Sequence, residues 1–520
     1  MKSRPSPVIH GRLPDGSPQH RIRGDLYYWG DHIPSAGSRP TTDVGRRPPT
    51  EGNDMRANLS RRAMIRTFGG CAAVGAKAAF GASRDKPNVV VIVSDDHGYA
   101  DVSAFDHPSE KTPNIDRIGQ RGVRFTQGYV SAYVCAPTRA ALMTGRYQQR
   151  FGFFTASDSR AGMPLSETTI ADLLKKHGYA TGALGKWHLG LDMEHHPLRR
   201  GFDEFYGFLG HGGHDYFNLA PTERKYDSIW RNDKVIEDTG YLTDNLAREA
   251  VSFISRHERR PFFLYLAFNA VHFPLQAPEA TIKKYDTGNP KRNTLLAMLE
   301  HEDRAVGRVL DELKTRGLDQ NTLVVFFSDN GGAKNNAANN GALRDFKHSV
   351  YEGGIRVPFL MSWPAKLREN TVFRHPVICM DVLPTVAAAA GASLLKDREY
   401  HGKNLLPYLT GAASGPVHEW LFWDGDEKKL AVRNGRWKLV SNNARVELFD
   451  LEADMREKTD LSVKHPDAVE RLQSALDNWR RGNAPRIRST GGGADEDEEE
   501  GGARRPRAER KKGQAQRGKR

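Results

Sequence analysis

Cysteine and long apolar runs are both scarce in this sequence. Only three cysteines occur among 520 residues, and one of them, Cys71, lies in an Ala-rich segment near the N-terminus. Since Cys135 and Cys379 alone remain, we expect no disulfide framework. No apolar stretch approaches the roughly 20 residues that a membrane-spanning helix needs, so we also expect no transmembrane segment.

A strong charge on the body of the chain is a further absence. The formal net charge is +13, but residues 1–66 contribute +6 of it and residues 491–520 contribute +2. The remaining +5 is spread over residues 67–490 and is ordinary for a protein of that size. The basic composition is therefore weak support for nucleic-acid binding, and we expect no specific nucleic-acid partner. A cationic site for an anionic substrate stays open.

Composition and pattern divide the chain into four predicted parts. Residues 1–54 are rich in Pro, Gly, Arg and Asp without apolar periodicity, which predicts disorder. Near residue 411 the alternation of strands and helices gives way to closely spaced strands, two of them around an Asn434-Gly435 turn. The predicted parts are a disordered leader over 1–84, an α/β domain over 85–410, an antiparallel α+β subdomain over 411–486 and a charged disordered tail over 487–520.

The end of the leader carries a targeting pattern. Residues 55–83, "MRANLSRRAMIRTFGGCAAVGAKAAFGAS", combine adjacent arginines with a mildly apolar, small-residue stretch. This resembles a twin-arginine export signal and predicts export to the bacterial periplasm or the extracellular space, which makes Met55 a candidate start. The alternative is a basic, Ala-rich linker.

The segment after Pro87 alternates strand and helix patterns. "NVVVIVSDD" is a continuous β-branched run, typical of a strand buried on both faces. "SETTIADLLKKHG" starts with cap-type residues, places Ile170, Leu173 and Leu174 on one helical face and ends at Gly178. This alternation predicts an α/β fold with a mainly parallel central sheet sandwiched by helices, followed by a smaller C-terminal antiparallel sheet plus helix.

Oxygen ligands gather where two of these strands end. Asp95 and Asp96 end the first strand, and Asp329 and Asn330 end the "LVVFFS" strand. In open α/β sheets ligands bind beyond the carboxyl ends of the strands. Carboxylate and amide oxygens suit one Ca²⁺ or Mg²⁺ ion, and ligand type alone does not choose between the two. The alternative is that each acidic pair merely begins a turn.

Cys135 and several basic side chains are predicted to lie at the same edge of the sheet. "CAPTRAALMTG" reads as a helix that starts near Cys135, where free backbone amides favour an anion. The basic candidates are Arg139 one turn along that helix, Lys186 and His188 after a short strand, His272 after another strand, and Lys347 on a Gly-containing loop. Taken singly, each is more often a solvated or structural group, and a lone cysteine is more often a small buried hydrophobe. Together around a divalent ion they describe a pocket for a tetrahedral oxyanion.

Four segments carry a resemblance to a known family: "SDDHGYAD", "CAPTRAALMTG", "GYATGALGKWH" and "SDNGG". The Cys-x-Pro-x-Arg core with its Thr-Gly-Arg ending, together with the Gly-Lys-x-His segment, resembles the signature of the type I sulfatases of the alkaline-phosphatase-like superfamily. The resemblance runs from about Lys86 to about residue 480 and leans toward the arylsulfatase and N-acetylgalactosamine-6-sulfatase branch. It implies a sulfuric ester hydrolase that cleaves sulfate monoesters, with carbohydrate sulfates as the first expectation and aryl sulfates as artificial substrates.

The resemblance also implies how Cys135 acts. In this family a formylglycine-generating enzyme oxidises the motif cysteine to Cα-formylglycine, and the hydrated aldehyde is the nucleophile. A diol oxygen on residue 135 would attack sulfur and expel the alcohol. The second hydroxyl would then let sulfate leave by elimination, which a serine could not do. That chemistry accounts for a cysteine at this point of a cysteine-poor chain.

Further roles are implied by the family pattern. The implied ligands of one Ca²⁺, with Mg²⁺ as the alternative, are Asp95, Asp96, Cys135, Asp329 and Asn330. The implied catalytic groups are Arg139 and Lys186 for the diol and its charge, His188 as the base for elimination, and His272 and Lys347 for the sulfate and the leaving oxygen. The sequence departs from the family pattern, without losing a catalytic group, at Tyr133, Val271, Asp345, Phe346 and His348.

The sequence gives less information about the substrate than about the reaction. His211, His214 and Asp215 on the Gly-rich loop "GFLGHGGHDYFN" are candidates for contact with a sugar ring, the alternative being a plain connector. Two other function classes stay open: a phosphomonoesterase or phosphodiesterase on the same fold, and an inactive sulfatase-like protein that binds sulfated polymers. The cysteine and the single set of metal ligands favour the hydrolase of sulfate esters.

Overall fold

A ten-stranded sheet forms the centre of the computed structural model, which describes residues 86–105, 111–210, 213–425 and 428–487. Its strand order is β11-β2-β10-β9-β1-β8-β4-β5-β6-β7. The strands are β1 (Asn88–Ser94), β2 (Gly122–Phe125), β4 (Ala180–Lys186), β5 (Glu204–Phe208), β6 (Ile229–Arg231), β7 (Lys234–Ile236), β8 (Phe262–Ala267), β9 (Thr322–Ser328), β10 (Phe359–Ser362) and β11 (Thr371–Phe373). The predicted leader with its export signal, and the tail beyond residue 487, lie outside the described residues.

The middle of the sheet is parallel and fully buried. Strands β9, β1, β8, β4 and β5 all run parallel to their neighbours in this group, and Val91 of β1 is paired with Tyr265 on one side and Val325 on the other. Every residue of β1, β4, β8 and β9 is buried, which is why β1, β8 and β9 are nearly continuous apolar runs, whereas β4 consists mostly of small residues and ends at Lys186. The antiparallel additions β10, β6 and β7 are only three or four residues long, and such short strands gave no sequence signal.

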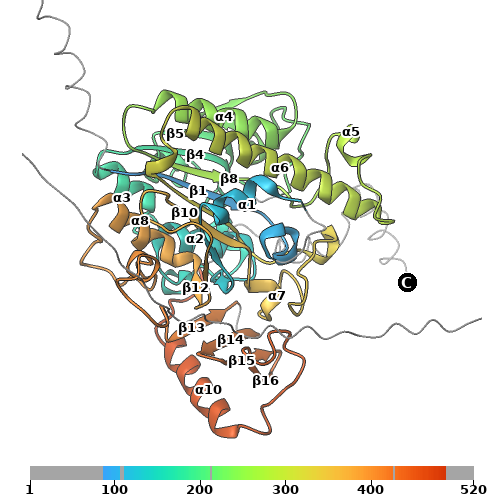
Figure 1. Cartoon of the computed structure of the whole chain (residues 1–520), viewed down its shortest axis with the longest axis vertical. Coiled ribbons are helices and arrows are strands. Elements are labelled where there is room, and N and C mark those ends of the chain that lie inside the picture. Colours follow the sequence, from blue (N-terminus) through green and yellow to red (C-terminus); the bar gives the residue numbers. More distant parts are fainter. Residues whose placement is uncertain (1–85, 106–110, 211–212, 426–427, 488–520) are drawn as a thin grey trace, which may run out of the picture. The chain divides into compact units, whose positions relative to one another are not determined.

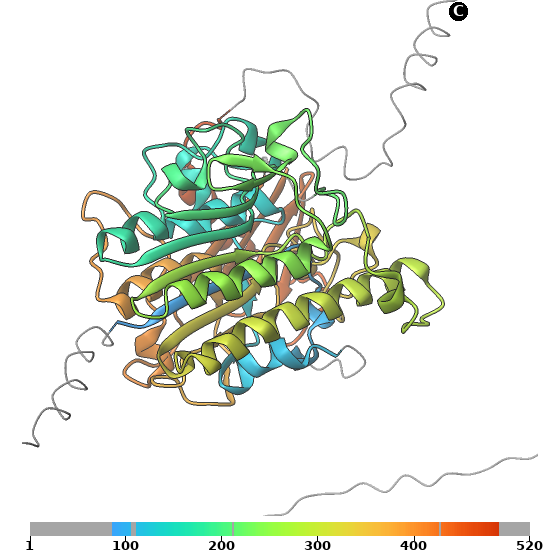
Figure 2. The same cartoon turned by 90° about the horizontal axis from the view of Figure 1, so that it is seen from above.

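Helices cover both faces of this sheet, as predicted. Alternate residues of β1 enter different cores: Val89, Val91 and Val93 pack on one side, and Val90 and Ile92 on the other. Figure 1 shows α4 and α6 above the sheet and α2 and α8 below it, and Figure 2 shows α4 and α6 running side by side. The helices of this part are α1 (Pro113–Gln120), α2 (Cys135–Thr144), α3 (Ile170–Lys176), α4 (Leu242–Arg256), α5 (Glu279–Ile282), α6 (Pro290–Thr315), α7 (Glu352–Ile355), α8 (Val382–Ala390) and α9 (Leu406–Leu409). Within the described residues, no helix has both the length and the apolar composition of a membrane span.

A second, antiparallel sheet lies near the C-terminus. Its strands, in spatial order, are β13 (Trp420–Asp424), β14 (Lys429–Asn434), β15 (Trp437–Asn442) and β16 (Arg445–Asp450), and α10 (Pro466–Arg480) accompanies them (Figure 1). Gly435 has φ +56° in the predicted turn between β14 and β15. The predicted fold class is thereby confirmed. The described residues all belong to one compact unit, so the domain boundary at residues 410 and 411 stays a prediction.

A third, two-stranded sheet pairs β3 (Gly128–Tyr129) with β12 (Val377–Ile378). Its strands lie on the approach to α2 and to α8 respectively, and both strands are buried. This pairing fixes the chain just before the segment that contains Cys135. The small sheet therefore helps to position the segment that carries Cys135.

Candidate active site

The ends of β1 and β9 bring the four predicted oxygen ligands together. Ser94 and Ser328 are paired in register, so Asp95 and Asp329 follow at the same level, and the Asp329 amide donates to Ser94 O at 3.1 Å. Asn330 Nδ2 donates to Asp96 Oδ1 at 2.7 Å. All four side chains are buried. The strand-end prediction was correct because parallel register carries two sequence-distant acidic pairs to one edge.

Cys135 is the first residue of α2, as the sequence predicts. Val134 before it is extended, and all ten residues of the helix are buried. The Sγ atom lies 3.3 Å from His188 Nδ1. Burial raises the pKa of the Cys135 thiol to about 11, even though Lys186 and Lys347 act in the opposite direction. The side chain is therefore a neutral thiol at pH 7 and is not a free nucleophilic thiolate.

Arg139 connects the helix of Cys135 to the end of β9. Its Nε and Nη2 atoms lie 2.9 and 2.7 Å from Asp329 Oδ2, and its Nη1 donates to the carbonyl of Lys186 and to the Tyr265 hydroxyl. Burial disfavours the charged guanidinium, but Tyr265, Asp329 and other neighbours outweigh it and raise the pKa of Arg139. The cation is therefore permanent, and it is aimed at a metal-ligand candidate.

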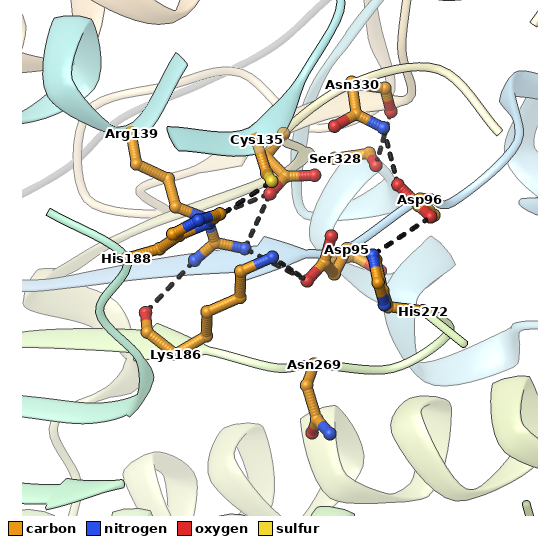
Figure 3. A network of polar contacts seen from close by, with 12 residues as sticks. Asp95, Asp96, Cys135, Arg139, Lys186, His188, Asn269, His272, Ser328 and Asn330 are labelled. Atoms are coloured by element: carbon orange, nitrogen blue, oxygen red, sulfur yellow. Dashed lines mark hydrogen bonds and ion pairs between the residues drawn. The ribbon is translucent and has the colours of Figure 1, made fainter. Parts of the chain in front are cut away.

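Lys186 ends β4 and forms a buried ion pair with Asp95. Nζ lies 2.6 Å from Asp95 Oδ2, and neither side chain is exposed. Burial opposes both charges, yet Asp95 raises the pKa of Lys186, and Lys186 holds the pKa of Asp95 below its usual range. Asp329, which has Asp95 as a like-charged neighbour, has its pKa raised by burial and by that neighbour. Figure 3 shows Lys186 reaching toward Asp95, next to Cys135 and Arg139.

His272 and Lys347 both contact the second carboxylate, Asp96. Lys347 Nζ lies 2.9 Å from Asp96 Oδ1, and His272 Nε2 lies 3.8 Å from Asp96 Oδ2. The other ring nitrogen of His272, Nδ1, is 2.7 Å from the carbonyl of Phe273, so Nε2 is the atom that faces the site. All three side chains are buried. The site is thus flanked by Lys186 on Asp95 and by Lys347 and His272 on Asp96.

The arrangement can hold a divalent cation. Two groups offer ligand atoms within 4.8 Å of one another, namely Asp95, Cys135 and Asp329, and Asp95, Asp96 and His272. The Oδ1 atoms of Asp95, Asp329 and Asn330 are buried and have no hydrogen-bond partner among the described residues. Buried oxygens without donors are costly unless a cation satisfies them. The donor set of carboxylate and amide oxygens fits Ca²⁺ or Mg²⁺.

The predicted site residues all come together at one place, and Figure 3 labels eight of them; Asp329 joins through Arg139 and Lys347 through Asp96. Sequence reasoning missed two further residues of this site. Tyr265 on β8 places its hydroxyl 3.1 Å from Arg139, and Asn336 places Nδ2 3.5 Å from Asp96 Oδ2. Tyr265 reads as an ordinary buried strand residue, and Asn336 lies in the Asn-rich stretch "KNNAANN", so neither carried a usable signal.

The Gly-rich loop near residue 214 has a structural role in its described part. Asp215 accepts from the amides of Phe217 and Asn218 and from Gln276 Nε2, which organises the loop itself. The His214 ring is buried against Phe208, and burial lowers its pKa. His211, the third candidate for sugar contact, lies outside the described residues. These contacts favour the connector interpretation for His214 and Asp215.

Comparison with known families agrees with this geometry. The sulfatase family model matches residues 87–392, which is more than half of the chain. The chain belongs to the sulfatase family. A second family model, for the C-terminal part of N-sulphoglucosamine sulphohydrolase, matches residues 344–481. Together the two matches cover most of the described residues of this sulfatase. They support its fold class and its reaction class, which is hydrolysis of sulfate esters.

Individual relatives extend over similar lengths. The uncharacterized sulfatase YdeN of Escherichia coli (strain K12) is 30% identical over 76% of this chain and 85% of its own length. The N-acetylgalactosamine-6-sulfatase of Canis lupus familiaris is 32% identical over 68% of this chain and 71% of its own. The crystal structure of Ps i-CgsB in complex with k-i-k-neocarrahexaose matches with a TM-score of 0.74 and 37% identity, over 78% of this chain and 95% of that one.

Proposed function

We propose that this sulfatase hydrolyses sulfate monoesters of carbohydrates, and aryl sulfates as well, with residue 135 as nucleophile after its conversion to Cα-formylglycine. The observation that carries the proposal is the position of Cys135, buried at the start of α2 among three cations and three carboxylates. The carbohydrate class is supported by relatives, since one is named for N-acetylgalactosamine and another was solved with a neocarrahexaose.

One divalent cation, Ca²⁺ with Mg²⁺ as the alternative, fits this donor set. The residues that would hold it are Asp95, Asp96, Asp329, Asn330 and residue 135. Bound there, the cation would supply Lewis acidity at the sulfate ester and favour ionisation of the attacking hydroxyl. Three carboxylates balance three cationic side chains in the site, so a divalent ion leaves it net positive. A net positive pocket suits a sulfate monoester anion.

We propose that residue 135 acts as the nucleophile after its modification and not as the thiol. As a cysteine it is a neutral thiol, because burial raises its pKa to about 11. Conversion by a formylglycine-generating enzyme would replace it with an aldehyde, whose hydrate supplies one oxygen for attack on sulfur and a second hydroxyl for release of sulfate. The position of Sγ in the cysteine form marks where those oxygens would lie. The modifying enzyme is therefore a proposed partner of the chain.

His188, Lys186 and Arg139 act on the nucleophile side. His188 Nδ1, 3.3 Å from Sγ, is within reach to take the proton of the second hydroxyl when sulfate leaves. Lys186 is held by Asp95 and supplies a fixed positive charge for the oxygen that becomes anionic. Arg139 adds a second fixed charge and keeps α2 at a constant distance from Asp329.

His272 and Lys347 act on the leaving-group side. Both contact Asp96, whereas His188 contacts Cys135. Each offers a donor that can hold a sulfate oxygen and protonate the leaving oxygen as the sulfur–oxygen bond breaks. This gives the departing alcohol its proton from a donor separate from the base His188. The proposed base, His188, and the proposed acids, His272 and Lys347, are thus different residues.

We also propose that the protein is exported through the twin-arginine-like signal at residues 55–83, to the periplasm or the extracellular space. The part of the chain in question is not described by the structure. An export assay with a reporter fused to residues 55–83 tests this, with Arg61→Lys and Arg62→Lys together as the variant that should abolish export. Reporter export that survives this change would contradict a twin-arginine signal.

The decisive experiment is the mass of tryptic peptide Phe125–Arg139, from protein made in a host that modifies sulfatases. A peptide lighter by the difference between CH₂SH and CHO, or its hydrate, together with turnover of 4-nitrophenyl sulfate, supports the proposal. Unmodified cysteine in a host that modifies a control sulfatase contradicts it and favours the inactive, polymer-binding alternative. Preference for 4-nitrophenyl phosphate over the sulfate would favour the phosphomonoesterase alternative.

A further inference from the structure

Lys347 belongs to a loop that is strained on both sides of it. The loop links η8 (Lys334–Asn336) to α7 and contains no regular element. Asp345 and His348 have φ of +68° and +70°, in the left-handed region. Residues with a Cβ enter this region only at a cost in free energy, so the surrounding structure must hold the loop in place.

The main domain supplies part of this support. The amide of Lys347 donates to Gly332 O at 3.0 Å, and the amide of His348 donates to Tyr133 O at 3.1 Å. Asn340 Nδ2 donates to the carbonyl of Asp345 at 3.0 Å. These hydrogen bonds connect the loop to the segments that carry Asn330 and Cys135. They leave the carbonyl of His348 for another donor.

That donor comes from the C-terminal sheet. Lys429, the first residue of β14, donates from Nζ to His348 O at 2.9 Å, and the same ammonium lies 5.2 Å from the centre of the Tyr133 ring. The Tyr133 hydroxyl in turn donates to the carbonyl of Gly425, next to β13. Lys429 is half-buried in this position. The second sheet therefore holds the loop one residue away from Lys347.

A second attachment fixes the far end of the loop. Lys438 on β15 is buried between two carboxylates, with Nζ 2.8 Å from Glu352 Oε1 and 2.9 Å from Glu457 Oε1. The amide of Glu352, where α7 begins, donates to Glu457 Oε2 at 2.7 Å. Arg344, before Lys347, donates to the carbonyl of Glu457 at 2.9 Å. Both flanks of the loop are thus bound to the C-terminal sheet or to the segment that follows β16.

We propose that the C-terminal sheet positions Lys347 in the active site, and that Lys429 is the positioning residue that acts at closest range. The inference rests on the proposed function, because it takes Lys347 as the cation that holds the sulfate. Without the Lys429 contact, fewer hydrogen bonds oppose the strain at His348, and the loop shifts from the position that places Lys347 against Asp96. A shift of about 1 Å in such a group is enough to cost up to a hundredfold in rate.

The test is a double-mutant cycle on protein of equal formylglycine content, with 4-nitrophenyl sulfate as substrate. Lys429→Met should lower kcat/KM about tenfold, the order expected for a lost hydrogen bond from a charged donor. Lys464→Met, which removes the same charge at an exposed position before α10, should leave kcat/KM unchanged. In a Lys347→Met background, Lys429→Met should cause no further loss, because its effect passes through Lys347.

Two further measurements make the cycle decisive. Lys429→Arg should recover most of the activity, since a guanidinium can donate to the same carbonyl. Hydrogen exchange of the Lys347 and His348 amides should be faster in Lys429→Met than in Lys464→Met. Equal losses in both backgrounds, or unchanged kcat/KM and exchange, would overturn the positioning role while the sulfatase function stands. If the wild type itself fails to hydrolyse 4-nitrophenyl sulfate, the proposed function fails. The exchange rates of the Lys347 and His348 amides then decide by themselves whether Lys429 positions the loop.

Discussion

Arg139 Nη2 lies 2.7 Å from Asp329 Oδ2, and neither side chain is exposed to solvent. The guanidinium belongs to the helix that begins at Cys135, and the carboxylate belongs to the end of β9. One buried ion pair therefore sets the distance between the nucleophile helix and a metal-ligand candidate. Breaking a buried pair by removing one partner costs about 3–5 kcal/mol, so this geometry is held strongly.

Replacement of Cys135 by alanine should abolish sulfate ester hydrolysis, with a loss of about three orders of magnitude or more in kcat. The fold should survive, because the change removes one buried sulfur atom and costs about 1 kcal/mol. Steady-state kinetics and a thermal unfolding curve check both parts. Cys135→Ser should retain sulfate on the serine after incubation with substrate, detectable by intact mass. Substantial turnover by the alanine variant would remove residue 135 from the nucleophile role.

Metal content should depend on Asp329. Asp329→Asn keeps an acceptor for Arg139 but removes a negative charge from the ligand set, so bound Ca²⁺ or Mg²⁺ and turnover should both fall at least about tenfold. Elemental analysis of the purified protein gives the metal stoichiometry. Asp311→Asn is the matched control, since Asp311 is exposed and forms a surface ion pair with Arg117. A normal metal stoichiometry in Asp329→Asn would refute the proposed site.

Modification of Cys135 should require an unfolded chain. The residue is 1% exposed, and every residue of its helix is buried, so no enzyme can reach it in the folded protein. A formylglycine-generating enzyme should convert a synthetic peptide of residues 125–145 but leave the folded, unmodified chain unchanged, as measured by peptide mass. Conversion of both at similar rates would show that α2 opens in the native state.

Stability should depend on pH through the buried cluster of Glu457, Lys438 and Glu352. Burial raises the pKa of Glu457 to about 7 from its usual 4.5. Burial also opposes the charge of Glu352, but nearby cations, Lys438 first, lower its pKa to about 2, so this group stays ionised above pH 4.5. A carboxyl with a raised pKa binds a proton on folding, so its contribution to stability grows as pH falls from about 7 to about 4.5.

The comparison of wild type with Glu457→Gln isolates this contribution. Between pH 5 and pH 7.5 the wild type should lose up to about 3 kcal/mol more of its free energy of unfolding than the variant. Urea unfolding at the two pH values measures the difference, and other titrating groups are common to both proteins. If the free energy of unfolding changes equally in both proteins, or falls more in the variant, then Glu457 does not bind a proton on folding in this pH range.

The sequence by itself determined that the main sheet is mainly parallel and where α2 starts. A β-branched run such as Val89–Val93 is sufficient to mark a strand buried on both faces, because burial on both sides leaves no polar alternation. The extended Val134 followed by a helix from Cys135 was likewise readable from local pattern. The candidate site residues were proposed from strand ends and from short motifs that resemble the sulfatase pattern, since each motif is a local signal.

Only the tertiary structure decided which of these residues face one another. Asp95 and Asp96 are neighbours in sequence, yet Asp95 pairs with Lys186 and Asp96 with Lys347, which is 251 residues away. The roles of Asn336 and Lys429 were also invisible, since neither lies in a motif. Local patterns encode which face of an element is buried, whereas pairing across the fold depends on register, loop path and desolvation, and these arise only when the whole chain is packed.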